Sequence, residues 1–422
     1  MKKYKVPRGT FDILPEESFK WQYITKTFRQ TTQLFNYREI VTPIFENSEI
    51  FERSVGDTSD IVEKEMYKFQ DKKGRELALR PEGTAPVVRS FVENGLHLKP
   101  NSAKLYYLGP MFRYDRPQKG RYRQFYQYGI ENIGSENPFI DAEVIAFAFH
   151  FLKELGLQNF ELQINSIGCE NCTKEYDIAL KKYFSKHLNE LCSDCKTRLE
   201  KNPKRVLDCK VKNCKTIAKD APSMLDYLDE DCKTHFSAIQ KYLSEMQIPF
   251  VINPKIVRGL DYYAQTAFEI IDTNLGAQNT LIGGGRYSKL VQQLGGANIS
   301  GIGFAGGFER LLLSLENENI IFGMEQKPEV YFVNLGENTK YESVKIISNL
   351  RKNGISCEFN PDKISMNAQM KEANKKGVKF CLILGENELK NNEIILKNMF
   401  TSEQQNVKRD KIIEAIITSK KS

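Results

Sequence analysis

The sequence predicts an α+β domain built on an antiparallel sheet over residues 1–325, followed by a smaller α/β domain over residues 328–422. A chain of 422 residues is too long for one hydrophobic core, so more than one domain is expected. In the first part several strand patterns follow one another directly, whereas strands and helices alternate in the last part. Residues from 169 to about 250 interrupt the strands with mostly helical, cysteine-dotted sequence, which predicts a helical insertion.

The first domain begins with an amphipathic helix, predicted over residues 16–35 because its apolar residues recur on one helical face. Thr84 is placed to cap a second helix, and Asp141 to cap a third. A glycine-rich turn is expected at residues 283–285, after the last strand. The strand patterns of this domain cover residues 39–43, 76–80, 104–108, 111–115, 123–133, 160–166, 263–271 and 280–282.

The last part of the chain alternates strands with helices after a linker at Lys327 and Pro328. Its predicted elements are strands over residues 330–335, 356–359, 380–384 and 394–399, and helices over residues 341–352 and 366–376. This order indicates a small α/β domain with a partly parallel sheet.

Charge is concentrated in the last part of the chain. Residues 327–422 hold 17 Lys and Arg against 12 Asp and Glu, a net +5 out of +7 for the whole chain. That surplus fits a polyanionic partner and equally fits a solvated lysine-rich surface. No apolar run reaches the ~18 residues of a membrane span, and no signal-peptide pattern opens the chain. We therefore expect a cytoplasmic protein with no membrane partner and with reduced cysteines.

The segment FRYDRPQKGRYRQFYQYGIE, residues 112–131, has the pattern of a polar β-hairpin. In its second strand alternate side chains share a face. One face therefore presents an aromatic ring, an amide, a glycine and a carboxylate, from Phe125, Gln127, Gly129 and Glu131. Such a set is poor core material and fits the floor of a polar pocket.

The first strand of this hairpin and its loop are basic. Arg113 and Asp115 are expected to share a face, and the loop carries Arg116, Lys119 and Arg121. Guanidinium groups bind phosphate oxygens in a bidentate fork, so the hairpin suits a phosphate-rich substrate. A solvated basic hairpin without a ligand is the alternative.

The segment GIGFAGGFERLLL, residues 301–313, contains a literal G-x-G-x-x-G. No hydrophobic strand precedes it and no βαβ unit surrounds it, which argues against a dinucleotide site. It is better interpreted as a small-residue strand that leads into a helix, where glycines let the backbone approach a ligand closely. Arg310 stands apart from the apolar stripe of that helix.

Two C-x-x-C pairs lie in the insertion, at Cys169–Cys172 and Cys192–Cys195, with Cys209 and Cys214 shortly after. Thiolates at such spacing are typical of structural zinc in a reducing compartment. A structural zinc on Cys192, Cys195, Cys209 and Cys214 is one interpretation. Cysteine also serves as a small buried hydrophobe, and the sequence leaves both open.

These segments resemble the three motifs of class II aminoacyl-tRNA synthetases. EIVTPIFE at residues 39–46 resembles motif 1, the hairpin resembles motif 2, and residues 301–313 resemble motif 3. RGTFDILP at residues 8–15 and RGLDYY at residues 258–263 are similar to the histidyl-tRNA synthetase family. The resemblance implies ATP-dependent ligation of L-histidine to its tRNA through a histidyl-adenylate, with Mg²⁺ and a homodimer.

The resemblance also implies roles for individual residues. Arg113 would hold the ATP α-phosphate together with Arg258, and both are the expected catalytic residues. Phe125 would support the adenine, and Arg310 the γ-phosphate. Contact with the tRNA acceptor end is expected from the motif 2 loop, through Arg116, Gln118 and Arg121. Asp115 stands where the family usually has Glu, which leaves the contact of that carboxylate open.

Histidine binding is expected from three stretches. RPEGT supplies Glu82, Gly83 and Thr84 for the α-ammonium group. The imidazole ring needs partners for both nitrogens, and a pocket of paired polar groups rejects isosteres that lack them. The expected partners are Gln127, Glu131, Tyr262, Tyr263 and Tyr287, with Glu131 accepting from a ring N–H.

The last domain resembles the anticodon-binding domain of class II synthetases, which fits its positive charge. Two rivals remain at this point. A catalytically silent regulatory subunit would lack this domain and the motif arginines. An RNA sensor domain would normally be fused to a kinase, and no kinase motif is present.

Overall fold

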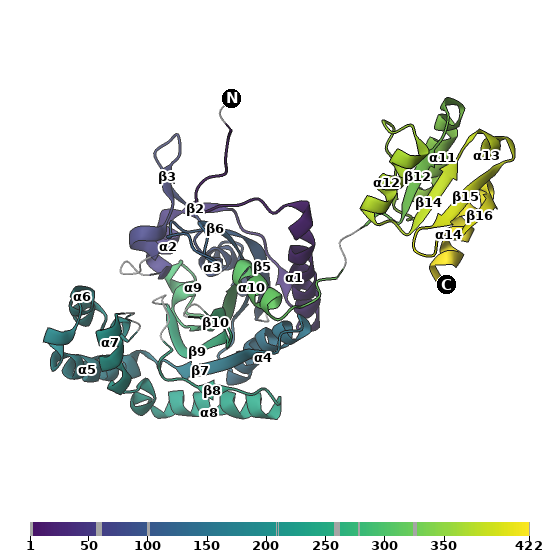
Figure 1. The fold of residues 1–422 in the computed structure, drawn as a ribbon. Helices are drawn as coiled ribbons and strands as arrows, with labels where there is room; N and C mark the ends of the chain where they lie inside the picture. The colour runs from purple at the N-terminus through teal and green to yellow at the C-terminus, as the bar shows by residue number, and fades with distance from the viewer. Residues whose placement is uncertain are drawn as a thin grey trace. The chain divides into compact units, whose positions relative to one another are not determined.

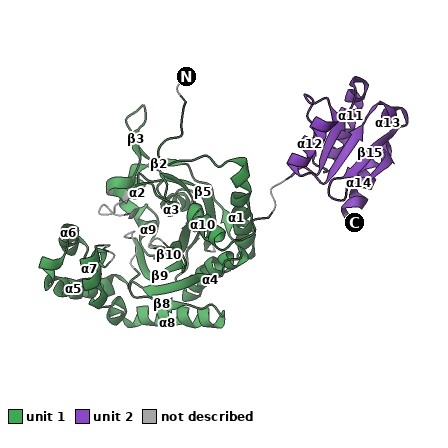
Figure 2. Ribbon diagram, in the orientation of Figure 1, with its two compact units in different colours: residues 1–322 green, residues 323–422 purple. Residues whose placement is uncertain are grey.

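The chain folds into two compact units in a computed structural model, residues 1–322 and residues 323–422, shown in Figure 2. Each unit is described by itself. The structure describes residues 3–55, 61–98, 102–207, 209, 211–256, 262–276, 279–323 and 327–421.

The first unit is built on an eight-stranded sheet (Figure 1). In sheet order its strands are β1 (Arg38–Glu39), β5 (Ala103–Phe112), β6 (Gln124–Ile133), β11 (Gly301–Gly307), β10 (Thr280–Tyr287), β9 (Tyr263–Asp272), β7 (Phe160–Ser166) and β8 (Val251–Ile252). Only the outer pairs β1–β5 and β7–β8 are parallel. The antiparallel α+β architecture is thus confirmed. A small three-stranded sheet consists of β2 (Phe45–Asn47), β4 (Glu76–Leu79) and β3 (Lys68–Gln70). Its strands lie between β1 and β5 along the chain.

Helices cover one face of the large sheet with an apolar core. The four helices are α1 (Pro15–Leu34), α4 (Pro138–Glu154), α8 (Glu230–Glu245) and α10 (Phe308–Asn317). Ile24 and Phe28 of α1 pack there on Tyr128 and Ile130 of β6, as the predicted helical face and strand face require. The other helices of this part are α2 (Ser48–Val55), α3 (Thr84–Glu93) and α9 (Leu290–Gln293).

Three predicted element boundaries are wrong. The two strands expected at 104–108 and 111–115 are the single strand β5, which ends at Phe112, so Arg113 and Asp115 lie in the following loop. Of the strand expected at 39–43, only Glu39 belongs to a strand, β1; farther on, Arg80 Nη1 donates to Thr42 O at 2.9 Å, so that this carbonyl bonds to a side chain. The expected turn at 283–285 lies inside β10, because those glycines are needed for close sheet packing. A Cβ at Gly284 would stand 2.4 Å from Gly303 O.

Asp141 does not cap α4, contrary to the prediction. The cap is Asn137, whose side chain accepts from Phe139 N at 2.9 Å. Asp141 is fully buried and accepts from Arg286 Nε at 3.1 Å, in an ion pair that no local rule could supply. A buried charge is tolerated there because it is paired.

The insertion contains α5 (Glu170–Ser185), α6 (Ser193–Lys201) and α7 (Lys212–Ile217). These helices share a small core of their own, in which five buried cysteines lie among apolar residues and Cys169 and Cys192 pack against them. The following helix α8 instead packs on α4 and on the main core through Phe236, Ile239 and Leu243. The helical character of the predicted insertion is therefore confirmed.

The second unit contains a five-stranded mixed sheet, confirming the α/β prediction. In sheet order its strands are β13 (Cys357–Glu358), β12 (Val330–Asn334), β14 (Phe380–Leu384), β15 (Glu393–Asn398) and β16 (Gln404–Lys408). The pairs β13–β12 and β12–β14 are parallel, whereas the pairs β14–β15 and β15–β16 are antiparallel. Its helices are α11 (Lys340–Lys352), α12 (Met366–Lys376), α13 (Glu386–Lys390) and α14 (Ile412–Lys421).

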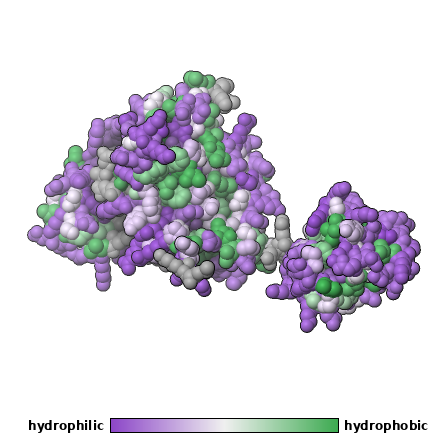
Figure 3. All heavy atoms as spheres, turned by 90° about the horizontal axis from the view of Figure 1, so that it is seen from above, coloured by the Kyte–Doolittle hydropathy of each residue, from purple (hydrophilic) through white to green (hydrophobic). Residues whose placement is uncertain are grey.

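The face shown in Figure 3 is mainly hydrophilic, with hydrophobic areas among the hydrophilic residues. Across the described residues, no helix combines the length and apolar character needed to cross a bilayer.

Candidate active site

A cavity of about 280 Å³ opens on the sheet face opposite the helical core. It is bordered by β6, β10 and β11 and by the loop that follows β5. Nine residues expected at the site line it: Glu82, Thr84, Arg113, Arg121, Phe125, Gln127, Tyr262, Tyr263 and Arg310. Segments far apart in the sequence thus meet around one space, as a ligand site requires.

Arg113 lies just beyond the end of β5 and is held in place by the protein. Its Nε donates to Pro81 O at 2.8 Å, and its guanidinium carbon is 5.3 Å from the centre of the Phe125 ring. The carbonyl and the ring together fix a charged group that lines the cavity. An anchored guanidinium is well suited to bind a phosphate.

Arg310 enters the cavity from the first turn of α10. Its Nη1 donates to Thr280 O on β10 at 2.7 Å, and this bond holds the Arg310 side chain against the strand that borders the cavity. The neighbouring Glu309 also lines the cavity and accepts from Tyr126 N at 2.9 Å. Burial raises the pKa of Glu309 to about 7. Sequence reasoning missed Glu309, although an acidic residue beside a motif arginine was a usable signal.

Glu82 caps α3, a role that the sequence assigned to Thr84. The Glu82 carboxylate accepts from Thr84 N at 2.6 Å and from Ala85 N at 2.8 Å. This leaves the Thr84 hydroxyl free to donate to Glu131 Oε1 at 2.7 Å. Burial raises the pKa of Glu82, while the two backbone donors oppose that rise.

Glu131 and Tyr287 are buried, and neither is among the described residues that line the cavity. Tyr287 Oη donates to Glu131 Oε2 at 3.0 Å, so both carboxylate oxygens already have donors. Burial nevertheless raises the pKa of Glu131 to about 8. The carboxylate sits tightly against β11, since a Cβ at Gly303 would stand 2.0 Å from Glu131 Oε2.

Gly83 contributes space and does not line the cavity. A Cβ at Gly83 would lie 2.2 Å from Cε2 of Tyr107, and one at Gly129 would lie 2.4 Å from Oη of the same ring. Tyr107 therefore fits between two glycines. Sequence reasoning did not identify this tyrosine, because its neighbours come from distant segments.

Two residues that line the cavity carry buried polar atoms without partners. Among the described residues, neither Gln127 Oε1 nor Tyr262 Oη has a hydrogen-bond partner. The Tyr262 ring stands beside that of Tyr263, with centroids 4.6 Å apart. Buried polar atoms are normally satisfied, so these two mark where a polar ligand would bind.

The basic loop forms the outer rim. Arg121 pairs with Asp115 at 2.9 Å, and a tight turn joins Arg121 to Gln118 through reciprocal backbone hydrogen bonds. Arg116 and Gln118 are exposed to solvent. Arg258, the remaining catalytic candidate, lies outside the described residues.

We expect the free energy of unfolding to fall as pH rises from about 5 to 8, and Glu131→Gln to flatten that fall. The folded state keeps a proton on Glu131 up to about pH 8, whereas the unfolded chain loses it near the ordinary value for Glu. Stability is thus lost with rising pH, at up to ~1.4 kcal/mol per pH unit from this group. Chemical denaturation followed by the fluorescence of Trp21, the single tryptophan, measures the free energy of unfolding of the first unit. The Trp21 ring stacks on Phe308 in the core of that unit, so its fluorescence reports the unfolding.

A matched control for this pH experiment is Glu245→Gln, at the exposed end of α8. It should leave the pH slope as in the unmodified chain. An unchanged slope in the Glu131 variant would contradict a buried, protonated carboxyl at that position.

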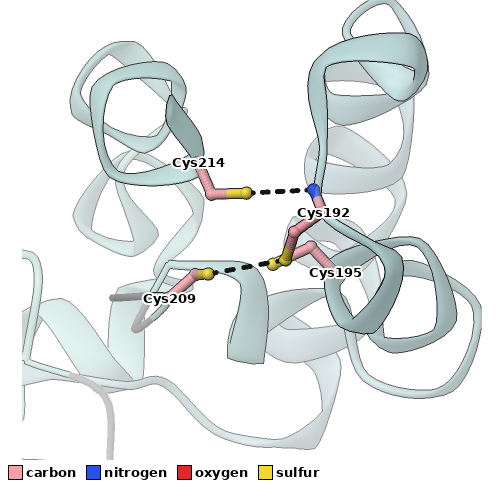
Figure 4. A group of neighbouring side chains, drawn as sticks. All are labelled: Cys192, Cys195, Cys209 and Cys214. Atoms are coloured by element: carbon pink, nitrogen blue, oxygen red, sulfur yellow. Dashed lines mark hydrogen bonds between the residues drawn. The ribbon is translucent and has the colours of Figure 1, made fainter. Parts of the chain in front are cut away.

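The cysteines predicted as zinc ligands are gathered in the insertion (Figure 4). The Sγ atoms of Cys192, Cys195, Cys209 and Cys214 all lie within 4.8 Å of one another. Cys192 N donates to Cys214 Sγ at 3.3 Å, and the Sγ atoms of Cys192 and Cys209 are 3.9 Å apart. Four converging thiols fit a tetrahedral Zn²⁺.

Comparison with known proteins gives consistent matches along the chain. A family model described as histidyl-tRNA synthetase matches residues 9–311, and one described as anticodon binding domain matches residues 329–419. Histidine–tRNA ligase of Clostridioides difficile is 51% identical over 413 residues and covers 98% of both chains. That of Bacillus licheniformis is 49% identical over 422 residues, 99% of this chain and 100% of its own. The crystal structure of apo S. aureus histidyl-tRNA synthetase superposes with a TM-score of 0.85 at 42% identity, covering 98% of this chain and 100% of its own.

Proposed function

The chain belongs to the histidyl-tRNA synthetase family, and on that premise we propose which of its residues carry out the reaction. It ligates histidine to tRNA at the expense of ATP. The observation that carries the residue assignment is a single cavity that combines arginines with buried, unpartnered polar atoms of Gln127 and Tyr262. Arginines suit the phosphates of ATP, and polar atoms without partners suit an amino acid with a polar ring.

In the first step a histidine carboxylate oxygen attacks the α-phosphorus of ATP, and pyrophosphate leaves. The nucleophile is already anionic, so positioning and charge stabilisation are needed and a general base is not. We assign charge stabilisation at the α-phosphate to Arg113 and Arg258. Phe125, against which Arg113 is stacked, supports the adenine, and Arg310 holds the outer phosphates.

Mg²⁺ is implied by the use of ATP. It favours carboxylate oxygens together with substrate phosphates, and Glu309 lines the cavity beside Arg310. We assign Glu309 as its protein ligand, where the ion would neutralise charge on the outer phosphates.

In the second step a ribose hydroxyl of the terminal adenosine of tRNA attacks the adenylate, and AMP leaves. The exposed loop side chains Arg116 and Gln118, with Arg121 at the rim, would meet the acceptor end. The positively charged unit of residues 328–422 would bind the anticodon arm, since phosphate contacts supply much of the affinity for RNA.

Histidine would be recognised by the carboxylate, amide and hydroxyl groups that line the same cavity. Glu82 and Thr84 line it where the α-ammonium group would lie, and Gln127 and Tyr263 would meet the ring. Glu131 acts from beneath through its bond with the Thr84 hydroxyl. Glu131 therefore influences the ligand by orienting that hydroxyl and does not line the cavity itself.

The working form is proposed to be a homodimer through motif 1. The segment that resembles motif 1 exposes Val41 at 80%, Ile44 at 47% and Phe45 at 53%. Neighbouring exposed apolar residues mark an interaction surface. A structural zinc on Cys192, Cys195, Cys209 and Cys214 completes the proposal. Because its substrate is tRNA, we place the enzyme in the cytoplasm.

Aminoacylation of total tRNA with each amino acid and ATP tests the function. We expect histidine alone to be charged. If another amino acid were attached to tRNA, the assignment would be wrong. If no amino acid were attached, the assignment would also be wrong, and a silent regulatory subunit would be favoured.

A further inference from the structure

A second cluster of metal-ligating side chains lies where the insertion leaves and rejoins the catalytic unit. Cys169 and Cys172 follow directly after β7, and Asp229 and Cys232 lie at the start of α8. Each of the four offers a ligand atom, and these atoms all lie within 4.8 Å of one another. Cys169 and Asp229 are 60 positions apart in the sequence, so the fold alone brings them together.

The two halves of the cluster are built alike. Cys169 is the N-cap residue of α5, and Cys172 lies three residues later in its first turn. Asp229 is the N-cap residue of α8, and Cys232 again lies three residues later. Two helix N-termini therefore meet at the cluster, and the partial positive charge at each favours thiolate and carboxylate ligands.

The contacts within the cluster match the size of a zinc ion. Cys169 Sγ lies 3.5 Å from Cys172 Sγ and 3.0 Å from Asp229 Oδ2. Zinc–sulfur bonds of about 2.3 Å place tetrahedral sulfur ligands roughly 3.8 Å apart, so small side-chain shifts are sufficient. Cys172 is 2% exposed and Cys232 is 1% exposed, which gives the site a closed interior.

Backbone groups already orient the ligand atoms. Asp229 Oδ1 accepts from Cys232 N at 2.8 Å, which turns Oδ2 toward the thiols. Asp229 N donates to Cys172 Sγ at 3.2 Å. The same kind of N–H to sulfur bond occurs in the other cluster, from Cys192 N to Cys214 Sγ. Outer hydrogen bonds of this kind orient metal ligands.

We propose that Cys169, Cys172, Asp229 and Cys232 bind a second structural Zn²⁺, so that the insertion holds two zinc ions. Three thiolates and a carboxylate form a closed four-ligand set that favours zinc over Mg²⁺ or Ca²⁺. Binding releases the three thiol protons. The ion clamps together the two chain segments at the base of the insertion, whereas the four-cysteine site stabilises its interior.

The proposed second zinc site also lies beside β9, the strand whose Tyr263 lines the cavity. Ile167 N donates to Gln265 O at 2.7 Å, and Gln265 N donates to Gly168 O at 2.8 Å. Gln265 lies on β9, two residues after Tyr263. Gly168 fits tightly against the cluster, because a Cβ there would lie 2.6 Å from Cβ of Cys172. The ion would thus fix the start of the insertion beside the histidine pocket.

Metal analysis of the full chain tests the proposal without any activity assay. The protein is purified under reducing conditions without chelator and its zinc is counted by mass spectrometry. We expect two zinc ions per chain, falling to one in the C172S/C232S double variant and to one in C195S/C214S. The control is C357A/C381A, which removes two buried cysteines of the second unit and should keep two.

Asp229→Asn provides a variant that keeps the fold, because asparagine caps helices as well as aspartate does. We expect it to weaken zinc at one of the two sites by at least about 10-fold, measured by competition with a chromophoric chelator. A count of one zinc that is unchanged in C172S/C232S would overturn the proposal. So would a Cys169–Cys172 disulfide in the unreduced protein, or equal affinity in Asp229→Asn.

Discussion

Replacing Arg113 by alanine is expected to slow histidine-dependent ATP–pyrophosphate exchange by about 10²–10³-fold, as loss of a transition-state donor does. The guanidinium is held by Pro81 O and by the Phe125 ring, so it is fixed before substrate binds. A fixed donor acts without reorganisation when charge develops on the α-phosphate. The exchange assay isolates this first step from transfer to tRNA.

Two further variants separate charge from geometry at this position. Arg113→Lys keeps the positive charge and loses the bidentate fork, so its exchange rate should lie between those of the unmodified chain and the alanine variant. Arg53→Ala removes an exposed arginine of α2 that pairs only with Glu49 in the described structure, and should leave exchange unchanged. Loss of less than about 10-fold in Arg113→Ala would remove Arg113 from the α-phosphate.

Arg258→Ala is expected to lower exchange by a similar factor, about 10²–10³, while leaving the fold intact. The expectation comes from the place of Arg258 in RGLDYY, four residues before Tyr262, which lines the cavity. Thermal unfolding at an unchanged temperature would show that the fold is retained. A near-normal exchange rate would remove Arg258 from the catalytic residues.

The double variant tests whether the two arginines share one phosphate. If both stabilise the same charge, their combined loss should be smaller than the product of the separate losses, because groups that act as a unit are not additive. A full product would indicate that they act at different places.

Some elements were predictable because their rules are local. The second hairpin strand was correctly divided between core and pocket, since Tyr128 and Ile130 are in the core and Gln127 lines the cavity. The period of two fixes this division wherever the strand lies. The same holds for α1 and for the helices α11 and α12 of the second unit, whose apolar patterns are strong.

Other elements failed where distant chain segments override a local signal. Gly109 and Pro110 lie between the two strands predicted at 104–108 and 111–115, yet they are inside β5. Beyond Tyr106 the strand has no β1 partner on that side, so a proline without an N–H is tolerated. Gly109 is required because a Cβ there would lie 2.5 Å from Nη2 of Arg80.

The sequence by itself determined the family, the order of the three motifs and the faces of the main strands, because these depend on residue type and short spacing. Only the tertiary structure decided which groups pair across long distances. In the folded structure Glu131 accepts hydrogen bonds from Thr84 and Tyr287. Asp141, predicted as a helix cap, instead pairs with Arg286. Cys169 lies within hydrogen-bond distance of Asp229. Such pairs have no fixed spacing along the chain, so only the folded backbone, with its burial of polar groups, selects them.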